Sequence, residues 1–482
     1  MKLSKILENL NYKRVIGTGD PEIKDICMDS NAVSKGSLFV CINGGNFDGH
    51  DFIRQVADYG GAAVVVERSL DTSVLQVVVE DTRVALSEIA AAFYGHADKK
   101  MKLIGVLGTN GKTTTTHLIT SILAGAGVKC GLIGTLGVFY DGKFKESALT
   151  TPDPIELHKT LAEMYESGVE AAVMEVSAHA VYLKKVCGLK FEIGVFTNFT
   201  QDHLDFFKDM ENYKQAKLAF FKENLCEYIV SNSDDGVGCE LAAKSNHCRN
   251  VITYGIDNPA DVFAIDINES SNETSFVLNL FDVIYDVKLN LIGEYNVYNA
   301  LAAGAACALY GVSPEKVVEG LENLKGVSGR LECVYGGEFT VYIDYAHTPD
   351  GLLKSLRTLK THTENRLICV FGCGGNRDKE KRPVMGKISG EIADFTILTS
   401  DNPRYEEPME IIWQVESGIK QTTGEYVIVQ ERADAIKYAL DAAVKGDIVL
   451  IAGKGSEKYQ EVFGIKRPFC DKDCVDDYLR RR

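Results

Sequence analysis

The chain has 482 residues, of which 45% are hydrophobic and 25% charged, and its formal net charge at pH 7 is −16. This length exceeds what one core supports, so we expect about two to four domains. The negative charge argues against a protein that binds nucleic acid or an anionic membrane. The thirteen cysteines are scattered, as is typical of free thiols. Residues 1–11 predict a short amphipathic helix, and no segment is long and apolar enough to span a bilayer, so we predict a cytoplasmic protein.

The first 97 residues predict a small α/β domain. Strands are expected at 37–42, 62–67 and 76–80, and helices at 51–59 and 82–94. Two polar loops, 28–31 with Ser30 and 43–50 with Asn46, interrupt this pattern. Their composition alone favours ordinary turn chemistry.

A glycine-rich turn between a predicted strand at 101–107 and a helix at 112–126 indicates a nucleotide site. Its residues are Gly108, Thr109, Asn110, Gly111, Lys112, Thr113 and Thr114. Glycines let backbone N–H groups surround an anion, and the helix N-terminus adds a positive dipole end. Lys112 is expected to reach the outer phosphates of ATP, and Thr113 or Thr114 to bind magnesium. Val106 occupies the place of the first glycine in the generic nucleotide loop.

Residues 98–328 alternate strands and helices as a doubly wound sheet does, so ligands are expected at the carboxyl ends of the strands. One apolar run ends in Glu175, Ser177 and His179, and the next is followed by Asn198 and His203. Because magnesium prefers oxygen ligands, Glu175 is the more natural direct ligand of the two candidates Glu175 and His203.

Two helices of this region carry unusual polar residues. Lys217 lies on the apolar stripe of a helix predicted at 212–222, so we expect it to be partly buried, with a partner or a lowered pKa. Asn296 and Asn299 lie one turn apart in a helix predicted at 294–310. They are expected either to read an adenine edge or to cap the helix.

A third unit starts after Arg330. Strands are predicted at 339–344, 366–371, 395–399 and 447–452, and each is followed by polar residues. Such convergence indicates a second α/β domain that faces a site. The residues concerned are Asp344, Arg377, Asp401, Asn402, Pro403, Arg404, Gly453 and Glu457.

Several of these motifs resemble those of the Mur ligases of peptidoglycan synthesis, and they run in order through essentially the whole chain. They are Gly108-Thr-Asn-Gly-Lys-Thr-Thr114, Glu175-Val-Ser177, Thr197-Asn-x4-His203-Leu-Asp205, Asn296-x-x-Asn299, Ser328-Gly-Arg330 and Asp344-Tyr-Ala-His-Thr-Pro349. The resemblance implies three α/β domains. These are a small uridine-binding domain at 1–97, a central doubly wound P-loop ATPase domain at 98–328, and a Rossmann-like, amino-acid-binding domain at 329–482.

Asp29-Ser30, Thr150-Thr-Pro152 and Asp401-Asn-Pro-Arg404 are similar to the family members that add the third residue of the peptide. The implied reaction is ATP-dependent. It joins meso-diaminopimelate to the side-chain carboxylate of D-Glu in UDP-N-acetylmuramoyl-L-Ala-D-Glu, through an acyl phosphate. L-lysine and lanthionine stay open as alternative amino acids. The implied partners are these small molecules, with neither nucleic acid nor membrane, and the implied state is a monomer.

The resemblance also assigns roles to residues. Lys112, Glu175, His203 and Lys217 are implied to be catalytic; Thr113, Glu175, His203 and a carbamylated Lys217 would bind Mg²⁺. The implied ATP-binding residues are Gly108, Thr109, Asn110, Gly111, Lys112, Thr113, Thr114, Asn296, Asn299, Arg330 and Asp344. The implied UDP-MurNAc-dipeptide-binding residues are Ser30, Asn46, Thr150, Thr151, Ser177 and Lys185. The implied diaminopimelate-binding residues are Arg377, Asp401, Asn402, Pro403, Arg404, Gly453 and Glu457. Leu183 and Ser456 depart from the pattern of many relatives.

The choice of diaminopimelate rests on Arg404, whose guanidinium suits the distal carboxylate of that amino acid. Without that carboxylate the buried guanidinium is expected to be unpaired, so lysine should be rejected.

Three other functions fit the sequence less well. A folate polyglutamate ligase shares the ATP chemistry but would lack the N-terminal domain and the Asp-Asn-Pro-Arg motif. A GTP-driven switch would need an Asn-Lys-x-Asp stretch, which the sequence does not contain. A non-catalytic binding module would not need acid and amide residues at so many strand ends.

Overall fold

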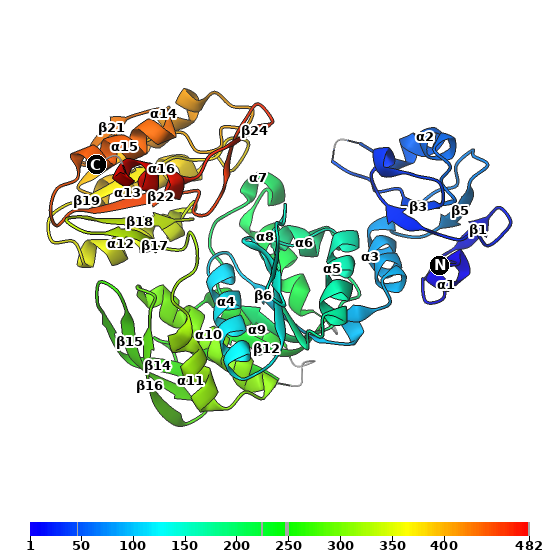
Figure 1. The fold of residues 1–482 in the computed structure, drawn as a ribbon, viewed down its shortest axis with the longest axis horizontal. Helices are drawn as coiled ribbons and strands as arrows, with labels where there is room; N and C mark the ends of the chain where they lie inside the picture. Colours follow the sequence, from blue (N-terminus) through cyan, green and yellow to red (C-terminus); the bar gives the residue numbers. More distant parts are fainter. Residues whose placement is uncertain (46, 223–224, 246–249, 481–482) are drawn as a thin grey trace.

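The computed structural model describes residues 1–45, 47–222, 225–245 and 250–480. It contains three α/β parts, each built around its own sheet, in a row from the blue N-terminal part to the orange and red C-terminal part (Figure 1). In the described part of the chain, no helix has the length and apolar character that a membrane crossing requires.

The N-terminal sheet has the strand order β1-β5-β4-β3-β2, and only β1 is antiparallel to its neighbour. Its elements are α1 (Leu3–Ile6), β1 (Arg14–Ile16), β2 (Asp25–Cys27), β3 (Ser37–Val40), α2 (Ile53–Asp58), β4 (Ala63–Val66), β5 (Leu75–Val78) and α3 (Thr82–Phe93). The predicted helix over residues 1–11 is wrong in length. Leu3 and Ile6 are buried in the domain core, and the backbone at Leu3 bonds to Pro21, so tertiary pairing leaves only a short helix.

The central sheet has eleven strands in the order β16-β15-β14-β13-β12-β11-β6-β10-β7-β8-β9. Strands β14 to β7 in this order are parallel, and antiparallel strands extend both edges. The strands are β6 (Lys102–Leu107), β7 (Cys130–Gly134), β8 (Gly137–Tyr140), β9 (Lys143–Lys145), β10 (Ala171–Glu175), β11 (Phe191–Phe196), β12 (Cys226–Asn232), β13 (Asn250–Gly255), β14 (Val262–Glu269), β15 (Thr274–Leu280) and β16 (Val283–Leu289).

Helices cover both faces of this sheet, which confirms the doubly wound fold. One face packs against α4 (Lys112–Gly125), α10 (Glu294–Tyr310) and α11 (Pro314–Asn323). The other packs against α5 (Pro154–Glu166), α9 (Gly236–Lys244) and the turn that follows α8 (Met210–Leu218). The helix predicted at 212–222 starts earlier, because Asp209 caps α8, and it ends earlier in a 3-10 turn at Ala219–Phe221. Short helices α6 (Ala178–Tyr182) and α7 (Leu204–Phe207) follow β10 and β11.

The C-terminal sheet has the order β17-β18-β22-β19-β20-β21, with only β17 antiparallel, as expected of a Rossmann-like domain. Its strands are β17 (Glu332–Gly336), β18 (Thr340–Asp344), β19 (Leu367–Phe371), β20 (Phe395–Leu398), β21 (Glu425–Ile428) and β22 (Ile448–Ala452). Its helices are α12 (Pro349–Thr361), α13 (Lys381–Ile392), α14 (Pro408–Ile419), α15 (Arg432–Ala442) and α16 (Asp471–Arg480), and β23 (Tyr459–Val462) and β24 (Ile465–Pro468) form a hairpin.

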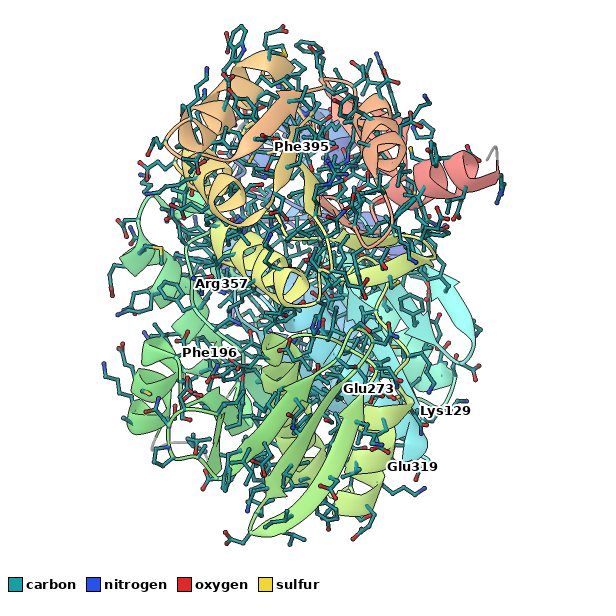
Figure 2. All side chains as sticks on the ribbon, turned by 90° about the vertical axis from the view of Figure 1, so that its left-hand side faces the viewer. Lys129, Phe196, Glu273, Glu319, Arg357 and Phe395 are labelled. Carbon is teal, nitrogen blue, oxygen red and sulfur yellow. The ribbon has the colours of Figure 1, made fainter. Side chains whose placement is uncertain are left out.

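The central and C-terminal parts meet at the carboxyl ends of their parallel strands. Figure 2 shows the C-terminal part, with Phe395 of β20, above the central part, with Glu273 at the β14–β15 turn. The Tyr342 hydroxyl donates to the carbonyl of Ser271 at that same turn, 3.1 Å away. The carboxyl ends of the central and C-terminal sheets, which carry the polar residues, therefore face the same region between the two parts.

Candidate active site

The phosphate-type loop is a four-residue turn between β6 and α4. Gly111 has φ +87°, and a Cβ there would lie 2.4 Å from Asn299 Oδ1. A Cβ at Gly108 would lie 1.8 Å from the Thr197 hydroxyl. Both positions therefore require glycine. Val106 pairs within β6 against Glu175 and Val195. Since it is a buried strand residue, the turn starts later than in the generic nucleotide loop.

Lys112 is the first residue of α4, and its side chain folds over this turn. Its Nζ donates to the carbonyl oxygens of Gly108 and Thr109, at 3.0 and 2.9 Å. Burial lowers the pKa of Lys112, and the charge of Glu175 partly offsets this effect. The ammonium group thus lies at the mouth of the loop, where an anion would meet it.

Glu175 ends β10 and lies against the start of α4. Its carboxylate accepts bonds from the Thr113 hydroxyl at 3.1 Å and from the Thr135 backbone and hydroxyl at 2.8 and 3.1 Å. Gly134 allows this approach, because a Cβ there would lie 2.3 Å from Glu175 Oε1. Arg330 belongs to the segment that leads into the C-terminal part, and its guanidinium donates to the Thr113 hydroxyl at 2.8 Å. Three segments therefore meet at Thr113.

Lys217 is 1% exposed, which confirms the prediction that it is buried. Its Nζ lies over the Tyr213 ring, 4.7 Å from the ring centre. Burial first, and then the nearby charge of Lys112, lower its pKa well below the ordinary value, as predicted. Lys217 therefore favours a neutral amine.

Asp202, a residue that sequence analysis did not select, joins both sides of the site. Its carboxylate lies 3.3 Å from His203 Nε2, 3.8 Å from His347 Nε2 and 3.8 Å from Lys381 Nζ. Burial opposes ionisation of Asp202, but the charges of His203, Lys381 and His347 lower its pKa. Burial also lowers the pKa of His203 to about 3, so that imidazole is neutral near pH 7.

A cavity of about 480 Å³ connects most of these groups, but Lys217 and Lys381 are not among its lining residues. Of the predicted residues it is lined by Thr109, Asn110, Gly111, Lys112, Thr113, Thr114, Thr150, Glu175, Ser177, His203, Asn296, Asn299, Arg330 and Asp344. Further polar lining residues that were not selected are Thr135, Asp202, Asp234, Asp235, Glu294, Tyr298, His347 and Lys354. His347 stands within the quoted Asp-Tyr-Ala-His-Thr-Pro motif, and Asp202 directly precedes His203. Attention to those neighbours would have found both.

The two asparagines of α10 connect that helix to α4, which follows the phosphate-type loop. Asn299 donates to Asn296 Oδ1 at 2.9 Å, and Asn299 Oδ1 accepts from the Thr115 hydroxyl at 3.3 Å. The capping interpretation is wrong, because Gly293 occupies the N-cap position of α10. Both asparagines line the cavity instead.

Asp344 is the last residue of β18. It lines the cavity and also holds a neighbouring backbone segment in place. Its carboxylate accepts from the backbone N–H of Leu331 at 3.0 Å, next to Arg330. Burial raises the pKa of Asp344, and hydrogen bonds from Ser355 counteract that effect. Asp344 therefore fixes the segment that brings Arg330 to Thr113.

The residues expected to hold the dipeptide substrate are only partly gathered. Thr150 lies 3.1 Å from the Thr135 hydroxyl, and Thr151 bonds to the backbone of Glu175 and Ser177. Lys185 lies outside the cavity lining and pairs with Asp153 at 2.7 Å. Ser30 is buried in the N-terminal part, away from the cavity lining, and Asn46 lies outside the described residues.

The amino-acid residues form a separate cluster on three loops of the C-terminal part. These loops follow β19, β20 and β22 and carry Arg377, Asp401, Asn402, Pro403, Arg404, Gly453 and Glu457. Arg404 donates to the Gly375 carbonyl at 2.8 Å and lies 3.5 Å from Glu461. The expectation of a guanidinium without a protein partner is therefore wrong. Glu457 accepts from the buried Lys454 at 2.8 Å, a partner that sequence analysis did not identify.

Comparison with protein families gives consistent matches along the chain. Residues 22–94 match a model described as "Mur ligase family, catalytic domain", 106–307 match "Mur ligase middle domain", and 329–455 match "Mur ligase, glutamate ligase domain". A protein of Clostridium acetobutylicum named UDP-N-acetylmuramoyl-L-alanyl-D-glutamate--2,6-diaminopimelate ligase 1 is 44% identical over 100% of this chain and 99% of its own. The chain belongs to the Mur ligase family.

Other Mur ligases support this assignment. A Bacillus licheniformis ligase with the same name, without the final number, is 43% identical over 98% of both chains. A solved structure of such a diaminopimelate ligase is 30% identical, covers 95% of both chains and has a TM-score of 0.68. A MurF structure from Acinetobacter baumannii, 21% identical with a TM-score of 0.70, shows that the fold is shared more widely.

Proposed function

We propose that this Mur ligase joins meso-diaminopimelate to the D-Glu side-chain carboxylate of UDP-N-acetylmuramoyl-L-Ala-D-Glu, with hydrolysis of ATP to ADP and phosphate. A carboxylate oxygen attacks the γ-phosphorus of ATP, and ADP leaves. The amine of diaminopimelate then attacks the acyl carbon, phosphate leaves, and the amine loses its proton. Close relatives bear names with this substrate and this amino acid, which supports the proposal.

The observation that carries the proposal is the meeting of three segments at Thr113. The hydroxyl of Thr113, in the first turn of α4 directly after the phosphate-type loop, lies within hydrogen-bonding distance of Glu175 at its strand end and of the interdomain Arg330. Phosphoryl transfer requires positioning and neutralisation of charge more than covalent help from the protein. Lys112 and Arg330 supply positive charge at this point, so they would stabilise the γ-phosphate as its negative charge shifts.

The donor set at Thr113 suits magnesium. Among the described residues no three His, Cys, Asp or Glu side chains gather as a metal site. Magnesium nevertheless fits, because it is commonly bound by one or two carboxylates together with substrate phosphates. Thr113 and Glu175 would hold it, with His203 at the same cavity. When bound, magnesium would neutralise charge on the phosphates of ATP.

We further propose that Lys217 reacts with carbon dioxide to form a carbamate. A buried lysine with a lowered pKa presents the neutral amine that this reaction needs. The product has oxygen atoms in place of a cation, so it would serve as a fourth metal-binding group beside Thr113, Glu175 and His203.

For the amino acid, we propose that Arg404 binds the distal carboxylate of diaminopimelate. Its recorded contacts to Gly375 and Glu461 use Nη1 and Nε, and a guanidinium offers five N–H donors. Glu457 would bind an ammonium group through its carboxylate, which also accepts from Lys454 at 2.8 Å. L-lysine and lanthionine remain the alternatives.

The division of labour among domains is part of the proposal. The N-terminal domain, residues 1–97, would bind the uridine part of the substrate through Ser30 and Asn46. The central domain, residues 98–328, would bind ATP, and the C-terminal domain, residues 329–482, would bind the amino acid. The three sheets lie within these ranges, which supports the boundaries. We propose a monomer that acts in the cytoplasm.

A coupled assay tests the proposed function. Purified protein, ATP, magnesium and UDP-N-acetylmuramoyl-L-Ala-D-Glu are combined with meso-diaminopimelate, L-lysine or lanthionine, and phosphate release and product mass are measured. We expect turnover with diaminopimelate. Turnover with lysine alone would overturn the role of Arg404 and leave the ligase intact, whereas no turnover with any of the three would overturn the proposed reaction.

A further inference from the structure

The loops after β19 and β20 are held together by a buried ion pair that has no assigned part in the reaction. Arg382, in the first turn of α13, is 0% exposed. Its guanidinium donates to both carboxylate oxygens of Glu406, at 2.9 and 3.0 Å. It also donates to the Gly374 carbonyl at 3.0 Å and to Gln414 at 2.8 Å. One side chain thus contacts both loops.

Glu406 contacts the loop after β19 as well. The backbone N–H of Asn376 donates to Glu406, and Lys379 lies 3.4 Å from it. Next to Glu406, the N–H of Tyr405 donates to Asn376 Oδ1 at 3.0 Å. The two loops are therefore joined by several bonds that all pass within two residues of Arg404.

Both loops also contain strained backbone. Asn376 has φ +50° and Arg404 has φ +51°, in the left-handed region that residues other than glycine rarely adopt. Such conformations persist only where surrounding contacts over-determine them. At Asn376 the bond from its N–H to Glu406 supplies such a contact. At Arg404 the backbone bonds to Glu461 and Phe463, and the neighbouring Glu406 N–H donates to the Pro403 carbonyl at 3.0 Å, so the Arg382–Glu406 pair acts on Arg404 through the adjoining loop.

The ion pair is poorly explained by stability alone. In the described part of the chain, Arg382 Nε is buried without a hydrogen-bond partner. A buried ion pair seldom stabilises a fold more than well-packed apolar residues would, whereas it does fix geometry. A geometric role is therefore the better explanation.

We propose that Arg382 and Glu406 are positioning residues for amino-acid selection: their ion pair holds the two loops so that Arg404 faces the distal carboxylate of the incoming amino acid. This inference rests on the proposed function. Neither residue touches the substrate, and both act through the backbone that carries Arg404. Gly374 shows how close the fit is, because a Cβ there would lie 2.9 Å from Arg404 Nη1.

The test compares Glu406→Gln with Glu416→Gln. Glu416 also lies in the C-terminal part and pairs with Lys420 and Tyr426, away from the two loops. For Glu406→Gln we expect the KM for diaminopimelate to rise about tenfold or more, because small displacements of a binding group are costly, while the KM for ATP changes less than about twofold. The preference for diaminopimelate over lysine should fall by a similar factor. Glu416→Gln should leave all of these values unchanged.

An equal rise in every KM, or an unchanged amino-acid preference, would overturn the positioning role. Thermal unfolding is measured alongside, and Arg382→Lys, which keeps the charge but loses the paired bonds, replaces Glu406→Gln if that variant does not fold. Failure of the wild-type protein to use diaminopimelate would instead contradict the proposed function, so the two failures are distinguishable.

Discussion

The cavity has a phosphate end, at Lys112 and Thr113. Its charged side chains differ in their pairing from those of the amino-acid loops after β19, β20 and β22. Lys112 donates to the neutral carbonyl oxygens of Gly108 and Thr109, and Arg330 donates to the neutral Thr113 hydroxyl, so neither of these contacts neutralises a cation. In the loops after β19, β20 and β22, charged side chains are already paired, as in Arg404 with Glu461 and Glu457 with Lys454.

This difference matches the two tasks proposed for the regions. A polyphosphate brings several negative charges, so a protein that receives it benefits from unneutralised cations. An amino acid that carries both positive and negative groups has almost no net charge. Binding it is therefore best served by protein charges that are already paired and held in place. We expect substitutions at the phosphate end to alter turnover, and substitutions in the loops to alter selection.

The largest effect is expected for Lys217→Met. Loss of a group proposed to bind the metal should lower kcat by about a thousandfold, since charge stabilisation is usually the largest catalytic contribution. A lowered folded-state pKa means that the unfolded chain binds more protons at neutral pH, so native Lys217 costs stability there, and this cost shrinks as pH rises toward the unfolded value.

Compared with wild-type protein that carries the free amine in buffer without bicarbonate, Lys217→Met should therefore unfold at the same or a higher temperature at pH 7, and its stability should depend less on pH between about 7 and 10. Steady-state kinetics and calorimetry measure the two effects. A variant that is active, or that is destabilised at pH 7, would show that Lys217 is an ordinary structural residue.

A smaller effect is expected for Gly134→Ala. The added Cβ would lie 2.3 Å from Glu175 Oε1, so the carboxylate must leave its position between Thr113 and Thr135. A displacement of this size should reduce kcat about a hundredfold. Gly236→Ala is the matched control, because its Cβ would contact nothing within 4 Å at the start of α9. Equal activity in the two variants would contradict the importance of Glu175.

The amino-acid loops are expected to affect how the stability of the protein changes at acid pH. Hydrogen bonds from Arg382 first, and then from Asn376, lower the pKa of Glu406 to about 2. Because this pKa is depressed, the stabilisation is complete above the unfolded value of about 4.3 and is lost as pH falls through the folded value. Glu406→Gln should cost about 2 kcal/mol in free energy of unfolding at pH 7, and this difference should shrink between about pH 4.5 and 2. Urea unfolding of both proteins across this range is the measurement, and a difference independent of pH would refute the assignment.

Sequence reasoning succeeded where the signal is local. The turn at 108–111, the strand end at Glu175 and the burial of Lys217 each follow from residues that are neighbours in the chain or on one helix face. The predicted helices and strands from residue 37 onwards mostly agree with the observed ones within two residues, with the early start and end of α8 as an exception.

The residues that were missed meet across long stretches of sequence. Asp202 becomes important only because His347 and Lys381 approach it from the C-terminal part. Lys454 and Arg382 were not identified from the sequence, because no periodicity in the chain shows which carboxylate will neutralise a lysine or an arginine. Long-range pairing of charges is therefore the part of the site that composition and spacing could not supply.

The smallest effect is expected for Arg404→Lys, and it is the most direct comparison of charge with geometry in the loops. Lysine keeps the positive charge and can still face Glu461, but it cannot form two parallel bonds to a carboxylate. We expect kcat/KM for diaminopimelate to fall about tenfold, with little change for ATP, because one of the two charge-assisted bonds is lost. Competition between diaminopimelate and lysine, followed by mass spectrometry, measures the selection. If the lysine variant selects as well as the wild type, charge alone decides and the strained backbone at Arg404 has another cause. The other outcome is that selection falls while turnover at saturation is kept. In that case the geometry of the loops determines which amino acid is selected, whereas unneutralised charge determines how the phosphate end binds ATP.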